Sequence, residues 1–353
     1  MVERVVVTGG LGFIGSRLCE TLLRQGREVV CVDDLRGEYA AAAGPAAALR
    51  LRSLGVELAL MDAEAAPLRG AGGVVHLAGL PGVRTRRPYA DIWAANAGLT
   101  ERLVEAAGAA GARFVLGSTS SVYGNPAELP TPEHSPVRPL GAYAMTKAAG
   151  EASVRAAARA GTKALTARLF TVYGPGQRPE MAFARWIDAL IRDRPLPWCA
   201  PLGAARDFTY VDDAVAGLVA ALDRGRPGEA YNVSGGRSLP LAYALGLLEG
   251  LIVRRARVER SAPSSAEARV TSACGRKAAA ELGYRPRMEL ADGLRLQLAA
   301  ALPPLAASRR RRPFGPGRAQ PARSRSGSGS RAVAPARESP RPAGPPAAAT
   351  SRG

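Results

Sequence analysis

The stretch Val5-Val6-Val7-Thr8-Gly9-Gly10-Leu11-Gly12-Phe13-Ile14-Gly15-Ser16 decides the fold expected for this chain. Its valines are β-branched and apolar, which predicts a buried strand of a parallel sheet. Glycines at positions 9, 12 and 15 follow, and a helix is predicted from Arg17 to Gln25, with Gly26 placed to cap its C-terminus. Glycines let a backbone turn tightly and approach a pyrophosphate, while a helix N-terminus offers free N–H groups. The stretch therefore predicts a phosphate-binding turn.

The next predicted strand, 28–32, ends at Asp33. An acid at this point accepts hydrogen bonds from both ribose hydroxyls of NAD, and it repels the 2′-phosphate of NADP. A glycine-rich turn alone is weak evidence, because other α/β proteins also contain one. Here the strand, the glycine spacing, the helix and the terminal acid agree, and together they predict NAD as the cofactor.

Strands and helices alternate over the first 170 residues. Further strands are predicted at 56–61, 73–77, 113–117 and 164–169, and helices near 40–50, 90–107 and 142–160. This alternation predicts right-handed crossovers and a Rossmann-type, doubly wound parallel sheet. After Phe170 prolines become frequent. The remaining elements, which predict a smaller lobe, are helices near 181–193, 213–222, 239–252, 276–282 and 290–302 and strands near 206–210 and 230–233.

Composition limits the setting of the protein. The 353 residues are 47% hydrophobic, which is enough for a core, and no apolar run of 18 residues predicts a membrane span. The chain starts directly with a strand, so we expect no signal peptide. Four separated cysteines and two histidines make no metal-ligand pattern, and they favour reduced thiols in the cytoplasm.

The formal net charge of +18 is concentrated in part at the C-terminal end. Residues 308–353 hold eleven arginines and one acid among Pro, Gly, Ser and Ala. Such a segment buries too little apolar surface to offset the entropy of ordering, so we expect a disordered basic tail. The run Arg309–Arg312 suits nucleic acid or anionic lipid, but composition alone favours a solvated tail over a specific nucleic-acid partner.

Tyr143 and Lys147 form the strongest catalytic pattern. Positions i and i+4 of a helix share a face. A free tyrosine has a pKa of about 10, so it needs nearby positive charge to act as a base near neutrality. Lys147 and a nicotinamide ring are expected to lower that pKa. A hydroxyl just after the fifth strand would then share the proton with Tyr143 and a substrate alcohol. An exposed Tyr–Lys helix pair is the structural alternative.

The polar run after the fifth strand carries a family resemblance. Ser118-Thr119-Ser120-Ser121-Val122-Tyr123-Gly124 resembles a segment of the NAD-dependent sugar-nucleotide epimerases and dehydratases, which are extended short-chain dehydrogenases/reductases. Matches continue at 168–175, 177–182 and 206–213. The combination of Phe-Thr-Val-Tyr-Gly-Pro with Arg-Pro-Glu-Met-Ala is most similar to UDP-glucuronate 4-epimerases. The resemblance covers about residues 1–300.

The resemblance implies a role for particular residues. The catalytic group would be Thr119, Tyr143 and Lys147. NAD contacts would come from Gly9, Gly12, Phe13, Ile14, Gly15, Asp33, Asp62, Ala63, Leu77, Ala78, Asn96, Tyr143 and Lys147. The UDP-sugar would meet Ser120, Ser121, Thr171, Arg178 and Arg206. No metal is implied. The domains would be residues 1–170 for NAD, interleaved with a nucleotide-sugar lobe at 171–307, and the tail at 308–353.

The implied reaction is inversion at C4 of a UDP-sugar through a 4-keto intermediate, from UDP-glucuronate to UDP-galacturonate, by an isomerase of carbohydrate metabolism. Ser120 and Ser121 stand where dehydratases and decarboxylases of the family carry acids, which favours epimerisation. A UDP-glucose 4-epimerase or another nucleotide-sugar dehydratase or epimerase is the first alternative.

A non-catalytic NAD-binding regulatory protein is the second alternative. It is motivated by departures from the family pattern at 200–205 and 273–277, and the intact Thr119, Tyr143 and Lys147 argue against it. By analogy with related epimerases, we expect a homodimer that pairs helices 90–107 and 142–160.

Overall fold

The computed structural model describes residues 3–36, 38–82, 87–262 and 266–302. The expectation of a disordered tail at 308–353 lies outside these residues. Within them, a parallel sheet of seven strands has the order β10-β6-β5-β4-β1-β2-β3. The strands are β1 (Arg4–Thr8), β2 (Glu28–Asp33), β3 (Glu57–Leu60), β4 (Gly73–His76), β5 (Arg113–Thr119), β6 (Ala164–Leu169) and β10 (Ala230–Val233). Strands β1 to β6 lie in the order β6-β5-β4-β1-β2-β3, which confirms the expected doubly wound fold.

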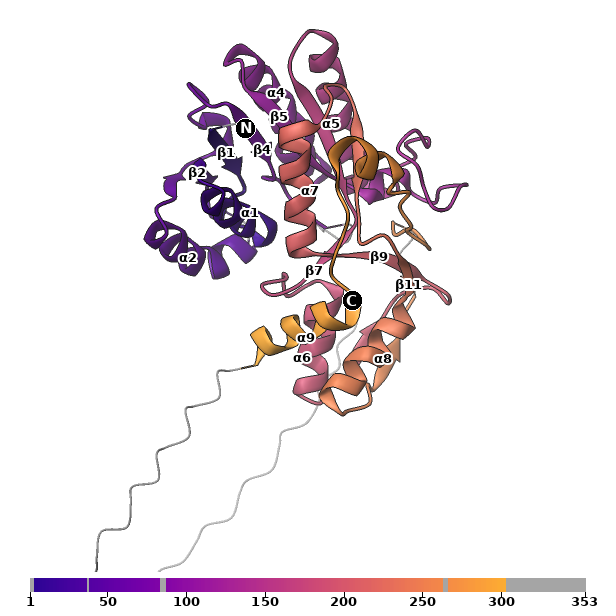
Figure 1. The fold of residues 1–353 in the computed structure, drawn as a ribbon. Helices are drawn as coiled ribbons and strands as arrows, with labels where there is room; N and C mark the ends of the chain where they lie inside the picture. The colour runs from indigo at the N-terminus through magenta and orange to yellow at the C-terminus, as the bar shows by residue number, and fades with distance from the viewer. Residues whose placement is uncertain (1–2, 37, 83–86, 263–265, 303–353) are drawn as a thin grey trace, which may run out of the picture. The chain divides into compact units, whose positions relative to one another are not determined.

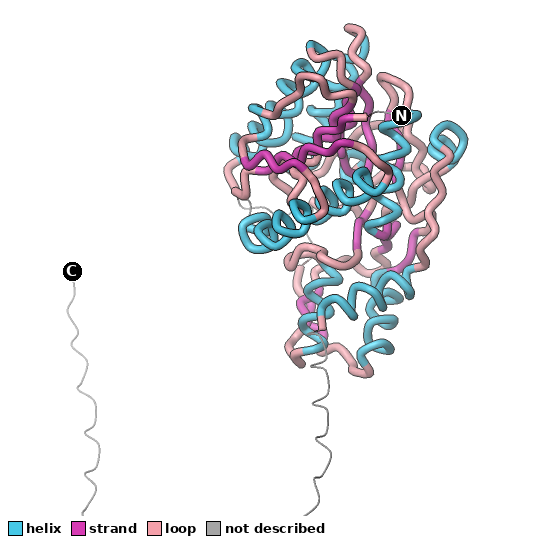
Figure 2. The backbone as a smooth tube through the Cα atoms, turned by 60° about the vertical axis from the view of Figure 1, so that its left-hand side comes forward, coloured by secondary structure: helices cyan, strands magenta, loops and turns pink. Residues whose placement is uncertain are grey.

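The strands of the large sheet are apolar because helices cover both faces (Figures 1 and 2). Side chains alternate across a strand, so Val5 and Val7 belong to one core cluster and Val6 to the other. The first cluster includes residues of α1 (Phe13–Arg24) and α7 (Val211–Arg224), and the second includes residues of α4 (Leu99–Ala109) and α5 (Gly141–Arg159).

Helix α1 begins at Phe13, four residues before the predicted start at Arg17. The glycine turn itself starts the helix, since the Gly12 N–H donates to the Gly9 carbonyl and the Ser16 N–H donates to the Gly12 carbonyl. The helix ends as predicted before Gly26, which has a φ of +77°.

The predicted helix 90–107 is interrupted. It consists of α3 (Tyr89–Trp93), a π-helical turn η2 (Ala94–Gly98) and α4. The wide turn contains Asn96, whose side chain hydrogen-bonds two other segments of the chain. A π-turn of this kind is a local irregularity that sequence periodicity does not reveal, and such turns are frequent at functional sites.

In the part of the chain that the structure describes, one further helix and three short helical turns lie outside the second layer of strands and helices given below. They are the helix α2 (Glu38–Ser53), the 3₁₀ turns η1 (Ala63–Ala65) and η3 (Ser120–Tyr123), and the π-turn η4 (Ala278–Leu282), where the sequence predicts an ordinary helix.

Residues after 170 contribute to both the large sheet and a second layer. Here β7 (Thr171–Tyr173), β9 (Ala205–Tyr210) and β11 (Ser238–Pro240) form a small sheet, and β8 (Leu196–Trp198) pairs with β12 (Val258–Arg260). Helices α6 (Ala182–Ile191), α8 (Leu241–Ile252) and α9 (Leu290–Ala301) pack together beside them (Figure 1). Between these segments the chain returns to the large sheet as α7 and β10, so the second layer is not continuous in sequence.

Leu218 tests the packing of α7 on the large sheet. The side chain is fully buried, so Leu218→Ala should lower the free energy of unfolding by about 2–5 kcal/mol, measured by denaturant titration. Leu296 on α9 is 46% exposed, and Leu296→Ala should change it by no more than about 0.5 kcal/mol. Equal losses in the two variants would contradict the packing described.

Candidate active site

The predicted site residues gather at one edge of the large sheet. Because the strands are parallel, their carboxyl ends meet at the same edge, and the strand order reverses between β1 and β4. The glycine turn follows β1, Asp33 ends β2, and Thr119 ends β5. This edge is where the geometry of a doubly wound sheet places a dinucleotide.

The glycine turn allows the backbone approaches that a bound pyrophosphate requires. Gly9 has a φ of +70°, and a Cβ there would lie 2.7 Å from the backbone nitrogen of Ala78. A Cβ on Gly15 would lie 2.1 Å from the Gly9 carbonyl oxygen. No side chain fits at either position, so the N-terminus of α1 is held directly against the turn. The residues present fit a dinucleotide phosphate.

Asp33 links the glycine turn to the end of β2. Its carboxylate accepts hydrogen bonds from the N–H groups of Leu11 and Leu35, both at 3.0 Å. Burial raises the pKa of Asp33, and these two N–H donors oppose the rise. A carboxylate has about four acceptor positions, so each oxygen retains one for a ribose hydroxyl.

Asp62 and Ala63 follow the neighbouring strand β3. The N–H of Met61 donates to the Asp33 carbonyl at 3.1 Å, which fixes the two strand ends side by side. Asp62 accepts from the Glu64 N–H at 3.0 Å, and Arg36 lies 3.4 Å from its other oxygen. The carboxylate is thereby held at the outer end of the same edge.

Asn96 joins the loop after β4 to helix α5. It accepts from the Leu80 N–H at 2.8 Å, donates to the Leu80 carbonyl at 3.0 Å, and donates to the Thr146 hydroxyl at 3.1 Å. The Leu77 N–H donates to the Thr8 carbonyl, so Leu77 and Ala78 lie beside the glycine turn. Asn96 therefore positions both the predicted NAD loop and the helix that carries the catalytic pair.

Tyr143 lies beside Thr119, as the sequence predicts, and also within the electrostatic influence of Arg178. In the protein alone, burial raises the pKa of Tyr143, while the Arg178 charge and a hydrogen bond with Thr119 lower it. The sequence predicted a lowered pKa for Tyr143 next to both Lys147 and a bound nicotinamide ring, and for that complex it stays a prediction. The sequence pattern could not reveal the burial of the phenol or the proximity of Arg178.

Thr119 is oriented by the turn that follows it. Its hydroxyl accepts from the Ser121 N–H and donates to the Ser121 hydroxyl, both at 3.2 Å. Ser120 is buried in the same turn, and Ser121 is half-buried. Thr171 begins β7, opposite Phe208 of β9. The predicted hydroxyls thus come from the ends of adjacent strands, since β5 pairs with β6 and β7 follows β6 directly.

Lys147 is buried one helical turn after Tyr143. Burial lowers its pKa to about 8, and Glu151 opposes this fall. His76 lies near enough for Lys147 to affect it, and burial lowers the pKa of His76 to about 3. The imidazole is therefore neutral near pH 7, with its Nδ1 2.7 Å from the Thr8 hydroxyl oxygen. Lys147 supplies the titratable positive charge next to the tyrosine.

Arg206 lies on strand β9, and Arg178 lies in the loop before α6. Arg206 donates to the carbonyls of Ala205 and Arg269, at 2.9 and 3.1 Å, and lies 3.5 Å from Glu267. Arg178 lies 3.3 Å from the exposed carboxylate of Glu180 and retains 18% exposure. Neither arginine is merely a surface residue.

Tyr39 is a contact that sequence reasoning missed. It lies on α2, and its hydroxyl donates to the Gly176 carbonyl at 2.7 Å. Gly176 also lies against Phe13 of the glycine turn. The loop that carries Arg178 is thus joined to two elements of the predicted NAD region. Residues 39 and 176 are too far apart in sequence for any local pattern to indicate the pair.

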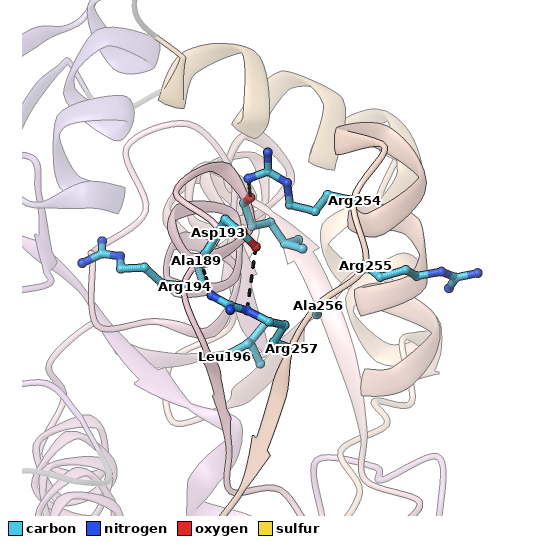
Figure 3. Close-up of a pocket in the computed structure, with 9 residues that line it drawn as sticks. Ala189, Asp193, Arg194, Leu196, Arg254, Arg255, Ala256 and Arg257 are labelled. Carbon is cyan, nitrogen blue, oxygen red and sulfur yellow. Dashed lines mark hydrogen bonds and ion pairs between the residues drawn. The ribbon is translucent and has the colours of Figure 1, made fainter.

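A separate group of arginines lies after α6 and α8, outside the strand edge (Figure 3). Arg254 donates to the carbonyls of Leu190 and Ile191 at 2.7 and 3.0 Å, and Arg257 lies 3.8 Å from Asp193. Cations at the C-terminus of α6 satisfy its last carbonyl groups. Some of the arginines that make the chain basic therefore have a structural role at the end of α6.

Over the described residues, no helix is long and apolar enough to cross a bilayer. The same residues contain no cluster of three His, Cys, Asp or Glu side chains suited to hold a metal. Cys19, Cys31, Cys199 and Cys274, all within the described residues, form no disulfide.

Comparison with known proteins gives a consistent picture. The model of the NAD dependent epimerase/dehydratase family matches residues 5–234. A protein of Bacillus subtilis (strain 168), named uncharacterized UDP-glucose epimerase YtcB, is 35% identical over 84% of this chain and 97% of its own length. UDP-glucuronate 4-epimerase 6 of Arabidopsis thaliana is 33% identical over 82% of this chain and 70% of its own.

A solved structure of similar fold is that of UDP-glucuronic acid 4-epimerase from Bacillus cereus, in complex with UDP-glucuronic acid and NAD. It is 33% identical, and the match has a TM-score of 0.78 over 84% of this chain and 98% of that one.

Asp33→Asn tests the ribose contact at β2. Loss of the charged acceptor should weaken NAD binding about 10- to 100-fold and reduce the preference over NADP, as measured by calorimetry with each dinucleotide. Asp34→Asn is the control, because the exposed Asp34 carboxylate accepts from the Arg36 N–H instead. Unchanged NAD affinity in Asp33→Asn would contradict the assignment.

Proposed function

The chain belongs to the NAD-dependent epimerase/dehydratase family, and from this premise we propose that it inverts C4 of a UDP-sugar, converting UDP-glucuronate to UDP-galacturonate. One observation carries the catalytic part: the Thr119 hydroxyl and the Arg178 charge both act on Tyr143, and Lys147 lies one helical turn further along α5. A hydroxyl, a phenol and two cations so placed can move a proton to and from a substrate alcohol.

The cofactor would be held by the residues that follow the first four strands. The turn from Gly9 to Gly15, with Phe13 and Ile14 at the start of α1, would receive the pyrophosphate. Asp33 would bind the ribose, and Asp62 with Ala63 would meet the adenine side. Leu77 and Ala78, positioned by Asn96, would line the path to Tyr143 and Lys147. Bound NAD⁺ supplies a hydride acceptor for C4 that later returns the hydride to the other face of a 4-keto sugar.

Tyr143 would take the proton of the sugar 4-hydroxyl while Thr119 donates a hydrogen bond to the same oxygen. Lys147 and Arg178 favour the phenolate because each places positive charge near it. On return of the hydride, the same phenol would donate its proton to the 4-oxygen. Tyr143 thereby acts as base and then as acid in one cycle, and its protonation state at the end equals that at the start.

The sugar carboxylate is the part of the substrate that distinguishes the proposal. Ser120, Ser121 and Thr171 would donate hydrogen bonds to it, and Arg178 and Arg206 would hold the negative charges of the nucleotide diphosphate. The two serines also replace the acids that a dehydratase uses to expel water. We therefore favour epimerisation of an acidic sugar within a nucleotide-sugar lobe formed by parts of residues 171–307.

UDP-glucose epimerisation is the second candidate, favoured by the name of the Bacillus subtilis relative. A neutral sugar would leave the hydroxyls near Thr119 without a carboxylate to bind. The cytoplasm as compartment is part of the proposal, because the four cysteines of the described residues form no disulfide.

Purified protein should convert UDP-glucuronate to UDP-galacturonate without added reductant. Chromatography of the nucleotide sugars measures this conversion. Tyr143→Phe should lower kcat by about two to four orders of magnitude and retain NAD, because the substitution removes the proton carrier but preserves its ring. Tyr89→Phe, on the exposed face of α3, is the matched control and should leave kcat unchanged.

The other candidates give different results in this assay. Product from neutral UDP-sugars alone would replace the carboxylate assignment by UDP-glucose epimerisation. Equal activity in wild type and Tyr143→Phe would retire the catalytic assignment, and NAD binding with no turnover of any nucleotide sugar would favour the regulatory alternative.

A homodimer through α3, α4 and α5 completes the proposal. Trp93 on α3 and Met145 on α5 expose 43% and 48% of their surface, and the two helices are in contact. Large apolar side chains on such a face favour a covered surface over a solvated one.

Light scattering at micromolar concentration should give twice the mass of the chain. Trp93→Glu should shift the mass toward that of one chain, since it places a charge in the covered surface. Leu296→Glu, at an exposed position of α9, should retain the dimer. A single-chain mass for the unsubstituted protein would reject the homodimer.

A further inference from the structure

We propose that Glu151 is a positioning residue of the proton-transfer site, whose buried carboxylate keeps Lys147 cationic while it anchors α5 to the ends of β5 and β6. This inference rests on the proposed function, because it gives Lys147 its role beside Tyr143. Glu151 lies four residues after Lys147, and no pattern in the sequence singled it out.

The Glu151 carboxylate is fully buried and holds several donors. The Ser118 hydroxyl donates to it at 2.6 Å from β5. Arg168 of β6 donates through Nε at 3.0 Å and through Nη2 at 2.7 Å. Arg155, one turn further along α5, lies 3.5 Å away. A carboxylate with these partners is fixed in position by charge-assisted hydrogen bonds.

The network continues beyond Arg168 to the motifs that the catalytic assignment leaves unexplained. Arg168 Nη1 donates to the Tyr123 hydroxyl at 2.8 Å and to the Glu133 carbonyl at 2.9 Å. The Tyr123 hydroxyl donates to Asn232 Oδ1 of β10 at 2.7 Å. Tyr123 and Arg168 therefore belong to one buried network with Glu151. The network fixes α5 relative to the strand end that carries Thr119.

Lys147 and Glu151 share a face of α5. Residues four apart on a helix are neighbours, about 5–6 Å between Cβ atoms, and both side chains are buried. The other groups around Lys147 do not provide negative charge: His76 of β4 is neutral, and Tyr143 is a phenol below its raised pKa. Glu151 is the carboxylate that acts on Lys147.

The direction of the electrostatic effect follows from these surroundings. Burial lowers the pKa of Lys147 to about 8, and Glu151 raises it against that fall. The lysine is cationic below this value and loses its charge as pH rises through it. Without the Glu151 charge, Lys147 would lose its proton at a lower pH. Lys147 would then be neutral at pH values at which Tyr143 has to act as a base.

A purely structural ion pair between Glu151 and Arg168 is the alternative explanation. Removal of either partner would then destabilise the protein and leave the Lys147 titration unchanged. The two explanations differ in one measurable quantity, the protonation midpoint of Lys147.

The chain contains three lysines, Lys147, Lys163 and Lys277, so their side-chain signals can be followed individually. Holoenzyme labelled with ¹³C at lysine Cε is titrated by NMR, and Lys147→Met assigns the signal. In Glu151→Gln, the Lys147 midpoint should fall by about one pH unit or more, and the alkaline limb of kcat should fall with it. Exposed Lys163 serves as the internal reference.

Two controls retain the charge of residue 151. Glu151→Asp should keep both the Lys147 midpoint and the pH profile near those of the wild type. Ser118→Ala removes a neutral hydrogen bond to the same carboxylate, so it should lower the melting temperature and leave the midpoint unchanged. If Glu151→Gln alone does not fold, the pair Glu151→Gln with Arg168→Met removes the unpaired buried cation and should show a smaller downward shift, because loss of the Arg168 charge opposes it.

An unchanged Lys147 midpoint in Glu151→Gln, or in the paired variant, would overturn the proposal and leave Glu151 a structural residue. A downward shift in Ser118→Ala equal to that in Glu151→Gln would also overturn it. The NMR readout does not require turnover. Failure of the epimerase assignment would appear as no conversion of any UDP-sugar, with the Lys147 titration still deciding the role of Glu151.

Discussion

The close approach of backbone at Gly9 determines how the rest of the strand edge is arranged. The turn passes so near Ala78, and α1 so near the Gly9 carbonyl, that a single added carbon at either glycine would collide with main-chain atoms. This contact fixes the position of the α1 N-terminus relative to the strand ends. In that position the Leu11 N–H donates to the Asp33 carboxylate. Three strand ends are thereby joined through main-chain contacts, which side-chain substitution elsewhere does not readily disturb.

Local patterns predicted the features that depend on neighbouring residues. Apolar runs and glycine spacing gave the strands of the large sheet, the glycine turn and the acid at Asp33, and helical periodicity gave the Tyr143–Lys147 pair. Patterns were less informative where distant segments decide the outcome. The π-turn at Asn96 depends on Leu80 and Thr146, and the raised pKa of Tyr143 depends on its burial. Neither the burial nor these contacts can be read from a single stretch.

The charges near Tyr143 are distributed unevenly among the elements. His76, from the centre of the sheet, stays neutral, while cations come from α5 and from the loop after β7. A buried carboxylate lies behind the lysine on the same helix. His76 is therefore the neutral group at the centre of the sheet, whereas Arg168 of β6 is a buried cation paired with Glu151. The predicted site residues lie at or beyond the carboxyl ends of the strands, so the strands themselves read largely as apolar runs.

The return of the chain to the large sheet has a consequence for how such proteins diversify. β10 pairs with β6 and α7 packs against α1, yet both are flanked in sequence by pieces of the small sheet. A recombination event that exchanged everything after residue 170 would replace part of the main core together with the second layer. The second layer can therefore be changed independently of the large sheet only piece by piece, in segments such as 174–181, and not as one contiguous block.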